Sequence, residues 1–350
     1  MPRMMPYIQA VGEALEQEMR RDPRVVAFGE DSIGGTGTDG PLGHAWGATK
    51  GLHEKVPGRV LDAPITEAAF VGAAVGAAAT GLRPVVDLLF VDFIGVCFDQ
   101  VLNQAAKLHY MSGGKAKVPL VLRAMYGAGM RRGAQHSQAL YPLVTHVPGL
   151  EVVVPSNAYD AKGLLTQAIR DDDPVVFFEH KMLAFVPGEV PEEPYAIPFG
   201  QAATVRSGSD CTVVAIGRMV SFAVQAAEQL AAEGIDCEVI DPRTLSPLDE
   251  QTIFASVERT GRLVVADEAT PRCGAAADIA ALVAQHRFEA LRAGVRMVTP
   301  PHAPQPFSPT LEDAFVPGAG QIAAAVRATL GALPPALEEL SSLVDLQRQR

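Results

Sequence analysis

Short runs of consecutive apolar residues, many of them β-branched, alternate with longer amphipathic stretches along most of this chain. A strand with one face in water alternates apolar and polar residues, whereas these runs are apolar at neighbouring positions and need both faces covered. The pattern predicts parallel sheets with helices on both sides. Predicted strands in the first half lie at 24–28, 59–62, 84–90, 118–122, 151–154 and 174–178, with helices at 67–80, 97–110 and 159–170.

A proline-rich stretch interrupts this alternation, after which it resumes. Four prolines fall between 187 and 198, and proline removes amide donors and fixes φ, so we expect an extended linker over 187–200. The fold prediction is α/β, with two doubly wound domains at 1–186 and 201–335 and a tail at 336–350. In the second domain, strands are expected at 211–216, 236–240, 263–266 and 295–298, and helices at 220–232, 249–259, 275–286 and 321–330.

Composition narrows the functional class. The net charge of −11 argues against a general nucleic-acid binder, because phosphate neutralisation needs clustered Lys and Arg. The four cysteines form no C-x-x-C pair, which gives a zinc or redox motif no support. The apolar run 68–79 is shorter than the roughly 20 residues that cross a bilayer, and the N-terminus lacks a signal-peptide pattern. We therefore expect a soluble, cytoplasmic protein with no membrane partner.

The segment from Gly35 to Gly40 matches the G-x-G-x-x-G pattern of dinucleotide-binding proteins. That fingerprint needs the first glycine directly after a strand and a helix directly after the third. Here six residues separate Phe28 from Gly35, and Pro41 follows the last glycine. A nicotinamide-dependent oxidoreductase is therefore disfavoured, and a flexible glycine-rich loop is the favoured interpretation.

Three residues are candidates for chemistry at strand ends. Glu67 begins a small-residue helix after a predicted strand, where Thr66 can cap the helix and the dipole favours an anion. On its own, Glu67 is more readily explained as a residue that stabilises the helix terminus. His136 lies in a polar loop after the glycine-rich segment 127–133 and can act as an acid or base, or be an ordinary surface histidine. Phe93 can stack on a ligand ring or belong to the core.

The helix that begins at Glu67 also carries Gly72 and Gly76, which are four residues apart. Small residues at this spacing form a flat stripe that lets another helix approach closely. The stripe suits a tight contact between subunits and, equally, a close helix contact within one domain.

Several segments in order resemble one family over almost the whole chain, from about residue 5 to 330. Segments 64–70, 86–99, 135–138, 147–150 and 168–178 are similar to those of the beta subunits of the first component of 2-oxo acid and acetoin dehydrogenase complexes. The resemblance implies a transketolase-like pyrimidine-binding domain followed by a transketolase C-terminal-like domain. Five shorter segments look most like the acetoin type: 114–116, 179–181, 246–250, 267–269 and 301–304.

The resemblance also implies a cofactor, thiamine diphosphate, and residues that contact it. Glu67 matches the family glutamate that hydrogen-bonds the aminopyrimidine ring, and Phe93 matches the aromatic residue that packs on that ring. Ile65 is expected to line the same pocket, and His136 matches the histidine that handles protons or orients substrate. A structural K⁺ is implied at positions whose oxygens are mostly main-chain, namely Leu120, Ala168, Ile169, Asp171 and Asp173, although 171–173 also reads as a plain acidic loop.

The partners follow from what the sequence lacks. Family members hold Mg²⁺ and the diphosphate through a Gly-Asp-Gly motif followed by Asn, and this chain has no Gly-Asp-Gly and only Asn103 and Asn157. The resemblance therefore implies an alpha subunit that holds Mg²⁺, an α₂β₂ heterotetramer, and delivery of the acyl group to a lipoyl-bearing acyltransferase core. The substrate stays open between acetoin, which is preferred, and pyruvate or a branched-chain 2-oxo acid. A non-catalytic scaffold of the same fold is the alternative of a different class.

Overall fold

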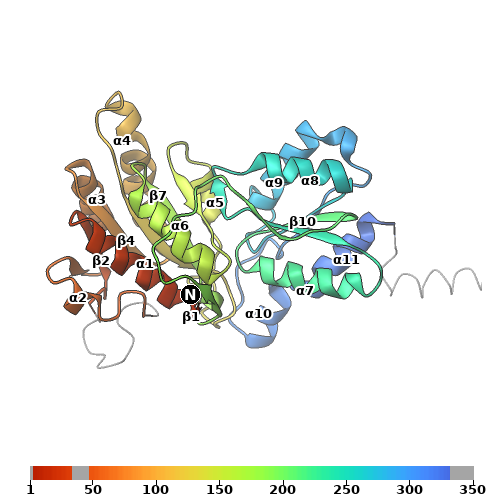
Figure 1. The fold of residues 1–350 in the computed structure, drawn as a ribbon, viewed down its shortest axis with the longest axis horizontal. Coiled ribbons are helices and arrows are strands. Elements are labelled where there is room, and N and C mark those ends of the chain that lie inside the picture. Colours follow the sequence, from red (N-terminus) through yellow and green to blue (C-terminus); the bar gives the residue numbers. More distant parts are fainter. Residues whose placement is uncertain (1–2, 34–46, 332–350) are drawn as a thin grey trace, which may run out of the picture. The chain divides into compact units, whose positions relative to one another are not determined.

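The computed structural model describes residues 3–33 and 47–331 of the chain (Figure 1). The chain splits into two compact units. The first comprises Met1–Ala202, Pro242–Asp249 and Ala303–Phe315, and the second Ala203–Asp241, Glu250–His302 and Val316–Arg350. The C-terminal half of the sequence therefore returns to the first unit twice.

The first unit is built on a parallel sheet whose strand order is β12-β6-β7-β5-β4-β2-β3, with β12 antiparallel at one edge. The strands of this unit are β1 (Arg3–Pro6), β2 (Val25–Glu30), β3 (Val60–Ala63), β4 (Arg83–Phe90), β5 (Val121–Tyr126), β6 (Glu151–Val153), β7 (Val175–His180), β8 (Pro187–Val190) and β12 (Thr244–Ser246). Its helices are α1 (Tyr7–Arg21), α2 (Leu52–Lys55), α3 (Glu67–Ala79), α4 (Ala106–Met111), α5 (Tyr141–Thr145), α6 (Ala158–Arg170) and α10 (Pro309–Phe315). Shorter helical turns are η2 (Val91–Gly95), η3 (Gln100–Ala105) and η4 (Lys181–Leu183).

Both faces of this sheet are buried, as the apolar runs predicted. Val85, Val121 and Phe177 point to one face and join a core with α1 and α6, which lie side by side in Figure 1. Their neighbours Val86 and Phe178 point to the other face and are buried as well, because successive side chains in a strand alternate between faces. The predicted helix at 97–110 is instead the π-helical turn η3 followed by α4.

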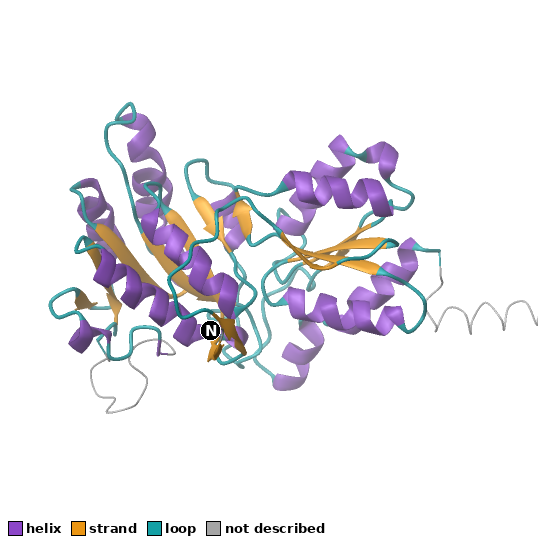
Figure 2. Cartoon of the chain, viewed as in Figure 1, coloured by secondary structure: helices purple, strands orange, loops and turns teal. Residues whose placement is uncertain are grey.

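The second unit is a smaller doubly wound sheet of order β14-β13-β10-β11-β9, in which only β9 is antiparallel. Helices cover both of its faces in Figure 2. Its strands are β9 (Ala203–Arg206), β10 (Cys211–Ala215), β11 (Cys237–Asp241), β13 (Leu263–Ala266) and β14 (Arg296–Val298). Its helices are α7 (Met219–Ala231), α8 (Glu250–Thr260), α9 (Ala275–His286), α11 (Ala319–Thr329) and the turn η5 (Phe288–Ala290). The predicted two-domain α/β architecture is confirmed.

The proline-rich segment is extended as expected, but it is packed against the first unit and is no loose linker. Its first residues form β8, which pairs antiparallel with β1. The buried Lys162 ammonium donates hydrogen bonds to the carbonyls of Pro191 and Glu192, and the Tyr195 ring stacks on Tyr159. Prolines restrict φ without preventing edge pairing, so composition alone does not separate a packed strap from a free spacer.

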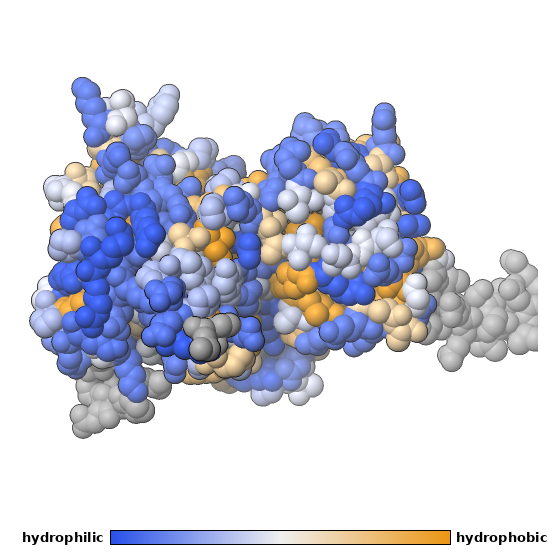
Figure 3. Space-filling view, in the orientation of Figure 1, coloured by the Kyte–Doolittle hydropathy of each residue, from blue (hydrophilic) through white to orange (hydrophobic). Residues whose placement is uncertain are grey.

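Two sequence features fall outside the described residues. These are the Gly35–Gly40 motif and the whole predicted C-terminal tail at 336–350. Among the residues that are described, no helix is long and apolar enough to cross a membrane. The face drawn in Figure 3 is mostly hydrophilic and carries separate apolar patches.

Gly127 offers a test of the packing after β5. Its φ is +89°, and a Cβ at this position would overlap the His180 imidazole. We expect Gly127→Ala to destabilise the chain by about 3 kcal/mol, since it combines left-handed strain with a buried overlap. Gly58→Ala is the matched control, because Gly58 has a φ of +77° but open space around it, and should cost only about 1 kcal/mol. Chemical denaturation measures both, and equal losses would contradict the packing argument.

Candidate active site

The sheet of the first unit brings the predicted residues to one edge. β3, β2, β4 and β5 are parallel neighbours, so their carboxyl ends lie together. Glu67 follows β3, Phe93 follows β4 and His136 follows β5. In open α/β sheets ligands bind beyond these ends, and the sequence alone predicted this placement.

Glu67 is the first residue of α3, and its side chain is largely buried. Among the described residues, no hydrogen bond or ion pair reaches its carboxylate. The positive end of the helix dipole is then the interaction that stabilises its negative charge. Thr66 occupies the N-cap position without a side-chain capping bond, so the predicted cap is wrong. A buried carboxylate with free acceptor capacity suits a ligand that donates a hydrogen bond.

Cys97 links Glu67 to the turn that carries Phe93. Burial and, second, the charge of Glu67 raise the pKa of the Cys97 thiol to about 12, which places the two side chains close together. The Cys97 sulfur lies 3.6 Å from the Ile94 carbonyl and 4.0 Å from the Phe93 carbonyl. The thiol therefore stays protonated and is buried beside the turn η2.

Phe93 and His136 are in direct contact. Their ring centroids are 5.4 Å apart at an interplanar angle of 85°, and the imidazole also meets Phe90 edge to face at 5.0 Å. Edge-to-face pairs of this kind hold rings in a preferred orientation. The structure thus joins two of the predicted residues and adds Phe90, which the sequence analysis had placed only within a strand.

The loop that carries His136 is held by charged groups at three points. The buried Glu312 carboxylate of α10 accepts hydrogen bonds from the amides of Gly129 and Arg131, at 3.0 and 3.2 Å, and from the Arg131 guanidinium at 2.6 Å. Asp92 accepts the amide and the side-chain NH₂ of Gln138, at 3.2 and 2.8 Å. Between them, the Lys181 ammonium donates to the main-chain carbonyl of His136. These contacts fix an irregular loop that has little secondary structure of its own.

Apolar and small side chains surround Glu67 on the outer surface. Ile65 is 74% exposed, and Leu61 and Val96 are also exposed. The outward face of α3 consists of small residues, among them Ala69, Ala73 and Gly76, and a Cβ built on Gly76 meets nothing within 4 Å. The GxxxG stripe is therefore largely open here, with only Gly72 packed close to Gln100, and does not serve to pack α3 on its own sheet.

The residues predicted to hold a cation gather around the start of β7. The carbonyl of Leu120 accepts the Val175 amide at 2.8 Å, and that of Ile169 accepts the Arg83 guanidinium at 2.7 Å. Arg83 also donates to the Asp171 carbonyl. Each carbonyl keeps a second lone pair that can accept, although the Arg83 guanidinium already brings positive charge to those of Ile169 and Asp171. Within the described ranges, no group of three His, Cys, Asp or Glu side chains is arranged to hold a metal ion, so main-chain oxygens would have to supply most ligands.

Glu151 adds a buried carboxyl at the same place. Burial, with Asp171 and Asp173 nearby, raises the pKa of its carboxyl to about 8. One of its oxygens is buried without a hydrogen-bond partner. An unpaired carboxyl beside two aspartates is a surrounding that a cation would stabilise, so the residues present fit the predicted ion.

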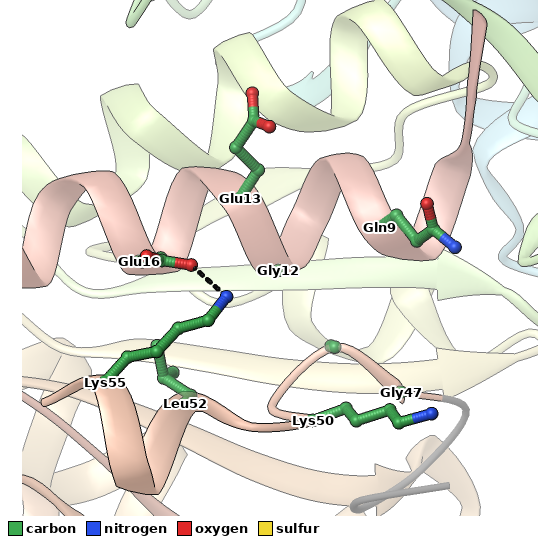
Figure 4. A pocket seen from close by; sticks show the side chains of 9 residues that line it. Gln9, Gly12, Glu13, Glu16, Gly47, Lys50, Leu52 and Lys55 are labelled. Atoms are coloured by element: carbon green, nitrogen blue, oxygen red, sulfur yellow. Dashed lines mark hydrogen bonds and ion pairs between the residues drawn. The ribbon is translucent and has the colours of Figure 1, made fainter. Parts of the chain in front are cut away.

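A separate cavity of about 300 Å³ lies between α1 and the segment around α2 (Figure 4). Its charged side chains largely satisfy one another, because Lys55 pairs with Glu16 at 2.6 Å and Glu13 pairs with Lys162 at 2.6 Å. It shares no residue with the site at Glu67.

Two family descriptions match the chain. "Transketolase, pyrimidine binding domain" covers residues 3–186, and "Transketolase, C-terminal domain" covers residues 200–322. A solved structure entitled "Split gene transketolase, inactive beta4 tetramer" aligns with a TM-score of 0.76 at 23% identity, over 93% of this chain and 98% of that chain. The fold and the two family matches thus define a protein of the transketolase class.

Relatives in sequence narrow this class. The chain is 60% identical to the "Acetoin:2,6-dichlorophenolindophenol oxidoreductase subunit beta" of Cupriavidus necator, over 94% of this chain and 98% of that protein. It is 52% identical to the protein of the same name in Bacillus subtilis, over 95% and 98%. It is 44% identical to a "Pyruvate dehydrogenase E1 component subunit beta" of Rickettsia felis, over 91% and 96%. The chain belongs to the transketolase-like family of dehydrogenase beta subunits, which confirms the predicted resemblance.

Sequence reasoning missed the residues that support the site. Glu312 lies far along the chain from His136, and nothing in its local pattern connects the two. Lys181 follows a strand, where a lysine is usually exposed, yet its side chain is only 1% exposed. The available signal was the polar triplet 179–181 at the end of an otherwise apolar strand, and the family resemblance related this triplet only to the acetoin type.

The Glu151 carboxyl should give the chain a measurable pH dependence. With its pKa raised from 4.5 to about 8, the folded state binds this proton more tightly than the unfolded state. Its contribution to stability is complete below pH 4.5 and is lost as the pH rises towards 8. We expect Glu151→Gln to raise the melting temperature relative to the native chain at pH 9 more than at pH 5. A difference that is constant across this range would contradict the shift.

Proposed function

We propose that this chain is the beta subunit of a thiamine-diphosphate-dependent acetoin dehydrogenase. The identity of 60% to a protein of that kind supports the assignment, as does the gathering of Glu67, Phe93 and His136 at one sheet edge. When bound, the cofactor supplies an electron sink at the carbon that attacks the substrate carbonyl.

Each residue of the site has a specific task in this proposal. Glu67 binds the aminopyrimidine ring through its buried carboxylate and holds a proton at the ring nitrogen. Phe93 packs on the same ring, and Ile65 lines the pocket beside it. His136, steadied by Phe90 and Phe93, moves a proton at the substrate or orients the lipoyl acceptor. The small-residue face of α3 and the apolar side chains around it suit contact with a second subunit.

In this proposal an alpha subunit binds the diphosphate and Mg²⁺. The sequence lacks Gly-Asp-Gly, and both asparagines make structural contacts. Asn103 donates to Asp99 at 2.6 Å, and Asn157 caps α6 by accepting the Asp160 amide at 2.9 Å. We place the chain in an α₂β₂ heterotetramer in the cytoplasm that delivers its acyl group to a lipoyl-bearing acyltransferase core. Four cysteines without a disulfide fit that compartment.

A structural K⁺ held by oxygens of Leu120, Ala168, Ile169, Asp171 and Asp173 belongs to the same proposal. The Glu151 carboxyl supports it, because one of its oxygens is buried without a hydrogen-bond partner and two aspartates lie nearby. Melting curves in KCl and in choline chloride at equal ionic strength test the ion. K⁺ should stabilise the native chain at pH 9, and should stabilise Glu151→Gln less. Equal curves in both salts would remove K⁺ from the proposal.

The activity itself is tested by co-expression with an alpha subunit that carries Gly-Asp-Gly. We expect dye reduction that depends on thiamine diphosphate and acetoin, and none from the beta chain alone. Activity on pyruvate or 3-methyl-2-oxobutanoate instead would keep the mechanism and replace the substrate. These two substrates are included because a pyruvate dehydrogenase subunit and a 2-oxoisovalerate dehydrogenase subunit are 44% and 39% identical to the chain. A well-formed complex without activity on any of the three would favour the scaffold.

Glu67→Gln tests the proton at the cofactor ring. The amide keeps the size of the side chain but lacks the negative charge that holds a proton at the ring nitrogen. We therefore expect kcat to fall by about 10²-fold or more while the complex still assembles. Glu54→Gln is the matched control, because Glu54 is also in the first turn of a helix but is exposed, and it should retain full activity. Near-normal turnover by Glu67→Gln would remove the assigned role.

A further inference from the structure

Lys181 is a buried cation whose position no part of the proposed chemistry has used. It begins η4 directly after β7, and only 1% of it is exposed. Burying an ammonium is costly unless its donors find acceptors in good geometry. One of these acceptors is the main-chain carbonyl of His136. The hydrogen bond to His136, a residue of the candidate site, therefore offsets part of the desolvation cost of the lysine.

The same ammonium contacts the ring behind the histidine. Its nitrogen lies 5.2 Å from the centroid of Phe90, and the Phe90 ring meets the His136 imidazole at 5.0 Å and 81°. A cation over an aromatic face is attracted to it, and a ring held from one side orients what packs on its edge. Lys181 thus acts on His136 through the main chain and through the side chain.

Little else holds the main chain of His136. Among the described residues, its amide makes only one hydrogen bond, a long one of 3.4 Å to the Gly133 carbonyl. The anchors at Glu312 and Asp92 act five or more residues before it and two residues after it. Without Lys181, the segment between these anchors would be free to rotate its carbonyl and shift the imidazole.

We propose that Lys181 is the positioning residue for His136, and that its charge keeps the imidazole in its working place. This inference rests on the proposed function for its kinetic test. It predicts that Lys181→Met lowers kcat by about 10²-fold, the loss expected from a displacement of about 1 Å, with a smaller change in KM and none in cofactor affinity. Lys181→Gln, which keeps a donor without the charge, should recover part of kcat and replaces Lys181→Met if that variant does not fold.

A double-mutant cycle separates positioning from general damage. If Lys181 acts through His136, adding Lys181→Met to His136→Ala should change kcat by no more than about twofold beyond His136→Ala alone. Losses that multiply would overturn the proposal. Lys162→Met is the matched control, because Lys162 is equally buried and binds Glu13, Pro191 and Glu192 instead. When it is assayed at a temperature where it is still folded, Lys162→Met should have the kcat of the native chain.

Limited proteolysis tests the inference without any activity. Arg131 and the exposed Arg132 lie in the loop, so trypsin cleavage after them reports its opening. We expect cleavage there to be at least tenfold faster in Lys181→Met than in the native chain, and unchanged in Lys162→Met. Equal cleavage in all three would overturn the proposal. A native complex that is inactive on every substrate, but whose loop opens only in Lys181→Met, would refute the proposed function and leave the positioning role standing.

Discussion

Arg123 joins the three central strands of the first unit from within the sheet. Its guanidinium donates to Glu179 on β7 at 2.7 and 3.1 Å and to Asp87 on β4 at 3.1 Å, and all three side chains are buried. A buried charge is tolerated only when fully paired, so a slip in strand register would break the group at high cost. Asp87 also accepts the amide of Leu89, whose φ of 68° turns the chain towards Phe90 and Phe93. The ionic group therefore fixes both the sheet and the direction in which the site leaves it.

The predictable part of the fold was the part set by local pattern. Apolar runs such as 84–90 and 211–216 require burial on both faces, and that requirement leads to parallel sheets without knowledge of long-range contacts. The strap at 187–200 and the return of 303–315 to the first unit were not predicted. Both depend on contacts between residues distant in sequence, such as Lys162 with Pro191 and Arg131 with Glu312, which leave no local periodicity.

The candidate site divides in the same way. Glu67, Phe93 and His136 each follow a strand, so topology and family resemblance were enough to select them. The residues that hold them could not be predicted from the sequence, because Glu312 and Lys181 look like ordinary charged residues until their burial is known. The potassium ligands were carried by resemblance alone, and the structure contributed Glu151, whose unpaired carboxyl no motif signals.

The return of the C-terminal half has a consequence for how the site is kept intact. Glu312 reaches the loop of His136 only after the chain has passed through all the strands of the second unit and all of its helices except α11. Its three hydrogen bonds satisfy two loop amides and an arginine that the loop cannot satisfy itself. The loop is thus held in place by a residue that lies about 180 positions after it in the sequence. A chain ending at the proline-rich strap would keep Glu67, Phe93 and Lys181 but lose this anchor, because Glu312 belongs to a segment that returns to the first unit after the second.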